Sequence, residues 1–310
     1  MRIAFIGQQD FGKATLEAFL ARGDTVAGVF CKPDKPGEKP DTLCAAAQTL
    51  GLPVFQFANL TGLEAEQAMR ELNADIGVMA YVLQFAPQSL VNIPKHGTIQ
   101  YHPSLLPRYR GPSSINWPIA RGDTVTGLSI FRPTDGLDEG PVILQKTCVI
   151  GPDDTLGEVY FNSLFPMGVA ALLEAADLVV SGQHREVAQD ESRAGYEGWF
   201  RVEESKINWA NHVDAVYDLI RACNPAPGAW TELVGVKVSL YDCRKHVTRR
   251  FAEVKGKPGV ISKITETSIF INAQGGTIEV VKLKPEGGKK MSGADFAKSF
   301  NLLALQTPPC

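Results

Sequence analysis

The chain has 310 residues, 44% of them hydrophobic, and a formal net charge of −3. This length exceeds what one typical domain needs and suits two, each with its own core. Its apolar segments are all shorter than the roughly 18 to 20 consecutive apolar residues of a membrane span, and the amino terminus reads as a buried strand instead of a cleavable leader. We therefore expect a cytoplasmic protein with no membrane partner.

The charge is distributed unevenly along the chain. Residues 1–200 carry 15 basic and 23 acidic side chains, a net −8, whereas residues 201–310 carry 16 and 11, a net +5. A basic part can contact a polyanion such as RNA, although a solvated basic face is the more common origin of such an excess. Charge alone therefore permits a nucleic-acid partner without favouring one.

The six cysteines are scattered, and no two have the CxxC spacing of a zinc site. We expect no metal centre and no disulfide framework, and we expect the thiols to be reduced. The six are Cys31, Cys44, Cys148, Cys223, Cys243 and Cys310.

Up to about residue 180 the sequence alternates short apolar runs with amphipathic helical patterns. Apolar positions recur at intervals of three and four over residues 13–20, and the acidic pair Asp153 and Asp154 precedes a long helical pattern over residues 155–180. This alternation predicts a Rossmann-like, doubly wound α/β domain whose mostly parallel sheet is covered by helices on both faces. Its expected strands are residues 3–6, 26–31, 54–57, 76–80, 97–101, 127–132 and 142–149.

The carboxyl-terminal part has a different pattern. A polar, glycine-containing stretch over residues 181–199 predicts a linker, so we expect a first domain over residues 1–200 and a second over residues 201–310. After a helical stretch at 212–222, short β-like runs separated by turn residues predict a smaller β-rich domain, an OB-like barrel or a sandwich. Its expected strands are residues 236–241, 259–264, 268–272 and 277–283.

A glycine-containing turn follows the first predicted strand. Gly7 and Gly12 bracket this turn, but Gln9 stands where the second glycine of a GxGxxG nucleotide-binding turn would be. We therefore expect no nicotinamide cofactor, and we interpret the two glycines as permitting a tight strand-to-helix turn. The amino terminus of the following helix remains able to attract an anionic group.

The candidate chemistry is concentrated after the fifth predicted strand. Gln100 and His102 are two residues apart, so their side chains share one face of an extended strand. The carboxyl ends of strands in an open parallel sheet are where ligands bind. Asp135 and Asp138 lie in the loop between the next two strands and compete as the partner of His102, although Asp135, followed directly by Gly136, suits a turn-capping role better.

Two motifs give the chain a family resemblance. The run QYHPSLLPRYRG at residues 100–111 and the segment DGLDEG at residues 135–140 resemble the formyltransferase superfamily that uses 10-formyltetrahydrofolate. Within it, the nearest likeness is to the amino-terminal hydrolase domain of 10-formyltetrahydrofolate dehydrogenase. That likeness rests on YHPSLLP at residues 101–107, SINW at 114–117, LFP at 164–166 and YEG at 196–198.

The carboxyl-terminal sequence extends the resemblance over nearly the whole chain. It is similar to the C-terminal domain of methionyl-tRNA formyltransferases in SKINW at residues 205–209, IRACNPAPGAW at 220–230 and GGKKM at 287–291. Because the dehydrogenase also has carrier and aldehyde-oxidising parts, the resemblance implies further domains if this chain belongs to a longer polypeptide.

The resemblance implies 10-formyltetrahydrofolate as formyl donor and a catalytic set of an asparagine, a histidine and an aspartate. By motif, the histidine is His102 and the aspartate is Asp138, while Gln100 occupies the asparagine position. Gln100 keeps an amide donor on a side chain longer by one methylene, and losing one oxyanion donor costs about 2.7 to 4 kcal/mol. This departure speaks against efficient formylation of an amine and leaves hydrolysis or an unusual acceptor open.

The resemblance also implies where the folate lies. It places the pterin against the loop after the fourth predicted strand, whose backbone would read the pterin edge. Leu105, Arg108 and Asp135 complete the implied folate site, and Arg108 and Arg110 are candidates for the glutamate tail or an anionic acceptor. The residues of the loop are Tyr81, Val82, Leu83, Gln84, Phe85, Ala86 and Pro87.

Three functional hypotheses remain open from the sequence. The first is an enzyme of the hydrolase-domain type, which releases formate or passes the formyl group onward. The second is a formyltransferase acting on an amine, either of a small metabolite or of methionyl-tRNA, with tRNA the less favoured partner. The third is a folate-binding module whose catalysis is impaired by Gln100.

Overall fold

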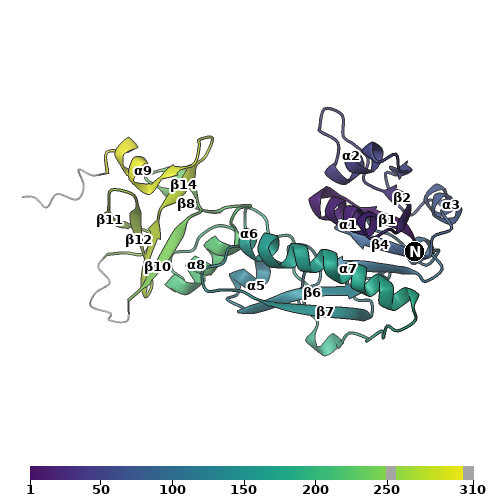
Figure 1. The fold of residues 1–310 in the computed structure, drawn as a ribbon. Coiled ribbons are helices and arrows are strands. Elements are labelled where there is room, and N and C mark those ends of the chain that lie inside the picture. The colour runs from purple at the N-terminus through teal and green to yellow at the C-terminus, as the bar shows by residue number, and fades with distance from the viewer. Residues whose placement is uncertain (249–255, 303–310) are drawn as a thin grey trace, which may run out of the picture. The chain divides into compact units, whose positions relative to one another are not determined.

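A computed structural model describes residues 1–248 and 256–302 of the chain (Figure 1). Cys310 lies outside these described residues. Two units can be distinguished by their internal contacts: unit 1 contains residues 1–111, 126–148 and 161–197, and unit 2 contains residues 112–125, 149–160 and the described residues from 198 onward. The single boundary expected at residue 200 therefore lies near the start of the continuous part of unit 2, while two earlier segments also cluster with that unit.

Unit 1 is built on a seven-stranded sheet with strand order β3-β2-β1-β4-β5-β6-β7. The first five strands of this order pair in parallel, and β6 is antiparallel to β5. The predicted Rossmann-like, mostly parallel sheet is thus confirmed. Its strands are β1 (Arg2–Gly7), β2 (Thr25–Phe30), β3 (Val54–Phe55), β4 (Ile76–Ala80), β5 (Thr98–His102), β6 (Val125–Phe131) and β7 (Val142–Val149).

Helices cover both faces of this sheet because its strands are apolar on both sides. On one face, Ala4 and Ile6 of β1 belong to a buried cluster with Met69 and Leu90. On the opposite face, which α1 and α7 cover, Phe5 is fully buried. The helices of unit 1 are α1 (Gln9–Ala21), α2 (Thr42–Thr49), α3 (Leu63–Glu71), α4 (Gln88–Val91), α7 (Phe165–Val180) and the 3-10 helix η2 (Glu191–Arg193).

The long helix expected over residues 155–180 is interrupted by a wider turn. It consists of α6 (Leu156–Val159), a π-helical turn η1 (Tyr160–Leu164) and α7. Pro166, near the start of α7, has no backbone N–H to donate to the preceding turn, which accounts for the irregularity. The hydroxyl of Tyr101 on β5 donates to the carbonyl of Leu164 at 3.4 Å.

This stretch, Leu156–Val180, is also the one helix of the described residues long and apolar enough to cross a membrane by length and composition. The same test is passed by core helices. In α7, Ala171, Leu172 and Ala175 are fully buried, and the helix packs on β4 and β5. Its apolar character is thus accounted for by packing on the sheet.

Unit 2 contains two four-stranded antiparallel sheets, with orders β10-β13-β12-β11 and β15-β14-β9-β8. The prediction of a β-rich carboxyl-terminal part is confirmed. The strands are β8 (Ala229–Leu233), β9 (Val236–Leu240), β10 (Cys243–Val247), β11 (Ile261–Ile264), β12 (Ile269–Ala273), β13 (Gly276–Val280), β14 (Lys282–Pro285) and β15 (Met291–Ser292). The helices are α5 (Asn116–Ala120), α6, α8 (Val213–Ala222) and α9 (Gly293–Ser299).

The strand predicted over residues 277–283 is wrong in its extent, because it is two strands, β13 and β14. The chain leaves β13 at Val281, whose N–H donates to the carbonyl of Asp242. Strands β8, β10 and β15 are not among the predicted strands. For β10 the reason is its sequence, Cys-Arg-Lys-His-Val, which lacks a clear apolar alternation. Its pairing with β13, and not its own pattern, makes it a strand.

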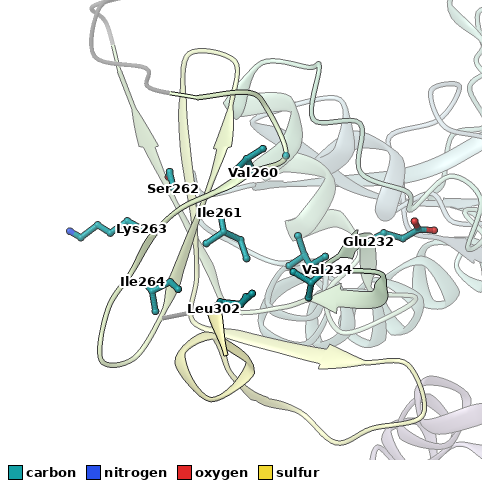
Figure 2. Close-up of a pocket in the computed structure, with 10 residues that line it drawn as sticks. Glu232, Val234, Val260, Ile261, Ser262, Lys263, Ile264 and Leu302 are labelled. Carbon is teal, nitrogen blue, oxygen red and sulfur yellow. The ribbon is translucent and has the colours of Figure 1, made fainter. Parts of the chain in front are cut away.

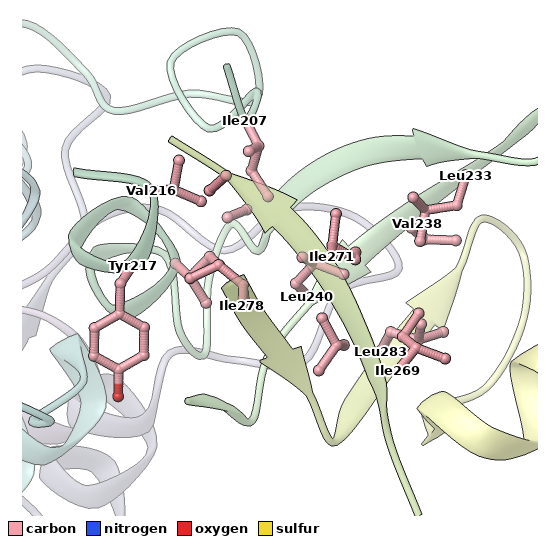
Figure 3. Packing of buried hydrophobic residues seen from close by; sticks show 14 of the residues in the cluster. Ile207, Val216, Tyr217, Leu233, Val238, Leu240, Ile269, Ile271, Ile278 and Leu283 are labelled. Carbon is pink, nitrogen blue, oxygen red and sulfur yellow. The ribbon is translucent and has the colours of Figure 1, made fainter. Parts of the chain in front are cut away.

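The core of unit 2 joins α8 to both sheets (Figure 3). Val216 and Ile220 of α8 are one turn apart and buried, as an amphipathic helix requires. They share this core with Leu240 of one sheet and Ile271 and Ile278 of the other.

The two glycines of the turn between β1 and α1 have ordinary dihedral angles. Gly7 is needed there because the backbone of β4 approaches it closely. A Cβ atom at Gly7 would lie 2.6 Å from the carbonyl oxygen of Ala80 on β4, and the residue with positive φ in this turn is Gln9, at 61°. The N–H of Gln9 donates to both carboxylate oxygens of Asp41, at 3.0 and 2.9 Å. The helix terminus that we expected to attract an anion thus holds a carboxylate of the same chain.

We predict that Gly7→Ala destabilises the protein by about 1 to 3 kcal/mol, because the added methyl group overpacks against a backbone oxygen that cannot rotate away. The free energy of unfolding from urea titration measures this. Gly198→Ala is the matched control, since a Cβ there meets nothing within 4 Å. Equal stability of the two variants would contradict the prediction.

Candidate active site

His102 lies at the carboxyl end of β5 and is held by a backbone carbonyl. Its side chain is buried, with 6% of the residue exposed, and its Nε2 lies 2.8 Å from the carbonyl oxygen of Tyr109. Because a carbonyl oxygen can only accept, Nε2 carries the hydrogen of this bond. In a neutral imidazole, Nδ1 is therefore the nitrogen with a free lone pair.

Asp138 faces that second nitrogen. Its Oδ2 lies 3.6 Å from Nδ1 of His102 and accepts a hydrogen bond of 2.8 Å from the N–H of Gly111. The 3.6 Å separation is longer than a hydrogen bond but too short for a water molecule to lie between the two atoms, so a small polar group that contacts both side chains lies beside the pair. The structure thus brings together the predicted His102 and Asp138, both buried.

Gln100 presents its side chain on the same face of β5 as His102. It pairs with Met79 of β4 and Phe131 of β6 and is partly exposed. Among residues 1–248 and 256–302, no side-chain hydrogen bond occupies its amide. The amide is therefore available to a ligand at this edge of the sheet.

Asp135 has a different role from Asp138. Its Oδ1 accepts from the N–H of Gln88, the first residue of α4, at 2.9 Å. The β6–β7 loop is thereby tied to the end of the segment over residues 81–87, which follows β4. This contact is with the first residue of a distant helix and is not the capping bond within its own turn that Gly136 suggested.

The segment over residues 81–87 lies at the same edge of the sheet as His102, because β4 and β5 are parallel neighbours. Tyr81 has a positive φ of 59°, and Leu83 and Phe85 are 53% and 55% exposed. Gln84 turns inward and donates to the carbonyls of Phe57 and Ala58 at 3.0 and 3.2 Å. Val82 and Pro87 are half-buried and Ala86 is buried.

The remaining predicted residues, Leu105, Arg108 and Arg110, differ in their contacts. Leu105 packs near Gly127 of β6. Arg108 is exposed, and its guanidinium stacks 5.0 Å from the ring centroid of Tyr109. Arg110, however, is only 8% exposed, and its hydrogen bond to Glu191 raises the pKa of its guanidinium. It is thus engaged within the protein, and the expectation that Arg110 meets a folate tail or an acceptor is not favoured.

The groups that hold His102 and Asp138 in place could not be recognised from the sequence. Two of them, the Tyr109 carbonyl and the Gly111 amide, are backbone atoms that every residue type can supply. The one local signal is Gly111 itself, which has φ of 88° and lies where a Cβ would be 2.6 Å from the ring of Tyr196.

Within the described parts of the chain, no group of three or more His, Cys, Asp or Glu side chains is arranged to hold a metal ion. A cavity of about 600 Å³ in unit 2 lies between β8 and β11 (Figure 2). It is lined by Val234, Val260, Ile261 and Leu302 with Glu232 and Lys263 at its rim, and it contains none of the residues discussed above.

Sequence comparisons define the class of protein. Residues 1–175 match the formyl transferase family model, and residues 200–301 match the model of the formyl transferase C-terminal domain. The chain therefore belongs to the formyl transferase family.

Individual relatives fall into two groups. The chain is 36% identical over 307 residues to human mitochondrial 10-formyltetrahydrofolate dehydrogenase, with 96% of this chain and 33% of that protein covered. It is 33% identical over 307 residues to methionyl-tRNA formyltransferase of Geobacter metallireducens, with 97% and 96% covered. The chain thus spans about a third of the length of the dehydrogenases it matches.

Solved structures agree on the fold. An N-formyltransferase from Helicobacter canadensis, in complex with folinic acid and dTDP-3-aminofucose, superposes with a TM-score of 0.69 at 16% identity, covering 90% of this chain and 98% of that one.

We predict that Asp135→Ala weakens folate binding about fivefold. The reason is that removing a helix-capping carboxylate costs about 1 kcal/mol, here at the end of the segment over residues 81–87. Fluorescence titration with a folate measures the Kd. Asp177→Ala removes an aspartate of α7 that contacts Arg22 instead and should leave the Kd unchanged; an equal Kd for both variants would count against a role for Asp135.

Proposed function

We propose that this protein cleaves the formyl group from 10-formyltetrahydrofolate by a reaction of the hydrolase-domain type, giving formate and tetrahydrofolate. The observation that carries the proposal is the buried pair His102 and Asp138, 3.6 Å apart, beside an unoccupied Gln100 amide at the sheet edge. Membership of the formyl transferase family and the 36% identity to 10-formyltetrahydrofolate dehydrogenase support the substrate.

The proposed reaction begins with a water molecule bound beside Nδ1 of His102 and the carboxylate of Asp138, within hydrogen-bonding distance of both. The water oxygen bonds to the formyl carbon while its proton passes to this pair. The carbonyl oxygen becomes an oxyanion, stabilised by the Gln100 amide and by the protonated imidazole. The bond from the formyl carbon to N10 then breaks as the proton is delivered to N10, so that tetrahydrofolate remains and formic acid leaves, which releases the second proton of the water to become formate.

The folate is proposed to lie along the segment over residues 81–87. Its backbone would hydrogen-bond the pterin edge, and the exposed side chains of Leu83 and Phe85 would cover apolar surface of the ligand. Tyr81, Val82, Gln84, Ala86 and Pro87 would shape this segment, while Leu105 would pack near the formyl end and Arg108 would face the glutamate tail.

A second candidate is formyl transfer to an amine. The 33% identity to a methionyl-tRNA formyltransferase over almost its whole length favours it, together with the net +5 of residues 201–310. The chemical steps are the same, with an amine nitrogen in place of the water oxygen.

The deciding experiment follows the absorbance change as the purified protein converts 10-formyltetrahydrofolate, first without an acceptor and then with a panel of amines and methionyl-tRNA. Turnover without acceptor supports the hydrolase proposal. Turnover only with one amine replaces it by the second candidate, and no turnover under any condition identifies a folate-binding module.

We predict that His102→Ala and Asp138→Ala each lower kcat by at least about 10²-fold, the usual contribution of a general acid or base. Folate affinity should change less than about twofold, because neither side chain is proposed to hold the pterin. His96→Ala, in the loop before β5, is the histidine control and should keep full activity. Wild-type turnover in either site variant would rule out this assignment.

We predict that Gln100→Asn increases formyl transfer to an amine acceptor relative to hydrolysis, because the shorter side chain withdraws the amide donor by one methylene, toward the position that the family's asparagine occupies. Gln100→Ala should slow both reactions by roughly 10²-fold, the value of one oxyanion donor. The ratio of the two product rates is measured in each variant. If asparagine and alanine at this position have the same effect, the amide is not an oxyanion donor.

A further inference from the structure

We propose that Gln189 is a positioning residue for the reaction, acting with Arg110 to fix the loop that carries Asp138. This inference rests on the proposed function of the His102–Asp138 pair. Gln189 belongs to the polar stretch over residues 181–199, which the sequence led us to interpret as a linker.

The amide nitrogen of Gln189 holds the Asp138 loop from behind. Nε2 donates to the carbonyl of Asp138 at 2.8 Å and to the carbonyl of Gly140 at 2.7 Å. Both hydrogens of the amide are therefore used on one loop. The two contacts restrain the backbone on either side of residue 139.

The amide oxygen of Gln189 also makes two hydrogen bonds, both with Arg110. Oε1 accepts from Nε and Nη2 of Arg110 at 3.0 and 2.9 Å. The outer edge of the same guanidinium donates to Glu191, with Nη2–Oε1 at 2.6 Å and Nη1–Oε2 at 3.0 Å. Arg110 is thus hydrogen-bonded to two residues of one segment, and Gln189 connects it to the Asp138 loop.

Arg110 stands between the two residues whose backbones hold the catalytic pair. Its predecessor, Tyr109, contacts His102 through its carbonyl, and its successor, Gly111, donates to the Asp138 carboxylate. The backbone of Arg110 is itself fixed, since its N–H donates to Gly195 and its carbonyl accepts from Glu197. One side-chain amide therefore joins the segment that holds His102 to the loop that supplies Asp138.

Asp138 needs such restraint. Its φ of 54° lies in the left-handed region, which a non-glycine residue occupies at a cost of roughly 1 to 3 kcal/mol. Relaxation of this strain would move the carboxylate away from His102. A displacement of about 1 Å can reduce a rate by as much as 10²-fold.

The test exchanges Gln189 for Glu, which has nearly the same size. A glutamate keeps an oxygen for Arg110, so the fold is retained, but it turns a second oxygen toward the carbonyls of Asp138 and Gly140 and cannot donate to them. We expect kcat to fall by about 10-fold to 10²-fold while KM and folate Kd change less than about twofold. The melting temperature should stay near that of the wild type.

A second readout is independent of activity. Hydrogen exchange of the Gly111 amide, which is protected by Asp138, should become at least about fivefold faster in Gln189→Glu. The reverse exchange three residues earlier, Glu186→Gln, is the matched control: among the described residues its carboxylate pairs with Arg132, at the start of the β6–β7 loop, and with His184, and it makes no hydrogen bond to Asp138 or Gly140. It should leave both kcat and the exchange of Gly111 unchanged.

The outcomes separate this inference from the proposed function. A folded Gln189→Glu protein with wild-type kcat and a protected Gly111 amide overturns the positioning role, whatever the reaction is. If His102→Ala keeps full turnover, the proposed site is wrong, while Gly111 exchange still reports on the bridge through Gln189. Should Gln189→Glu fail to fold, Gln189→Asn replaces it with the same readouts, because a side chain shorter by one methylene cannot reach both Arg110 and the loop.

Discussion

The N–H of Gly111 donates to Oδ2 of Asp138, and the direction of this hydrogen bond keeps the carboxylate facing the imidazole of His102. Two residues earlier, the carbonyl of Tyr109 holds the other side of that imidazole. A three-residue segment of backbone therefore sets the separation of the two side chains. Backbone groups suit this purpose because they have no rotamers to lose and because their positions are fixed by the surrounding fold.

The parallel sheet explains why the segment lies where it does. Strand β5 ends at His102, and its neighbour β4 ends at Ala80, at the same edge. The chain then turns back through residues 103–111, so that the polypeptide leaving β5 returns beside the side chain with which the strand ends. The loop between β6 and β7 meets it there and contributes Asp138, while Asp135 of the same loop ties it to α4. The site is thus assembled from strand ends whose order the sheet dictates.

The parts of this arrangement that follow local rules could be predicted from the sequence. Strand alternation placed Gln100 and His102 on one face, and the alternation of apolar runs with helices gave the α/β fold. The choice between Asp135 and Asp138 depended on a neighbouring Gly136, and the structure gives the two residues distinct contacts.

What could not be predicted depends on contacts between distant residues. Gln189 is 51 residues from Asp138 and 79 from Arg110, and a single glutamine in a polar stretch carries no periodic signal. Strand β10 was missed for a related reason, since its partner β13 stabilises it. Residues 181–199 were predicted to be a linker because the prediction used only their polarity and glycine content. Composition does not show which distant residues Gln189 and Glu191 contact by hydrogen bonds.

In the proposed site, hydrolysis and formyl transfer would use the same pair, His102 and Asp138, so the residues proposed to perform the chemistry would not select the acceptor. Selection of the acceptor depends on which nucleophile reaches the formyl carbon and on how well water is excluded from that carbon. In the free protein, Leu83 and Phe85 are more than half exposed, and the proposed folate would cover them. The ligand would therefore exclude water from its own pterin side. The side of the formyl group that stays open would then decide whether water or an amine reacts. A water molecule needs only hydrogen bonds with Nδ1 and Oδ2 from the open side of the pair, whereas an amine also needs a surface to hold the rest of its molecule. The proposed hydrolysis therefore requires fewer additional contacts than the proposed transfer to an amine.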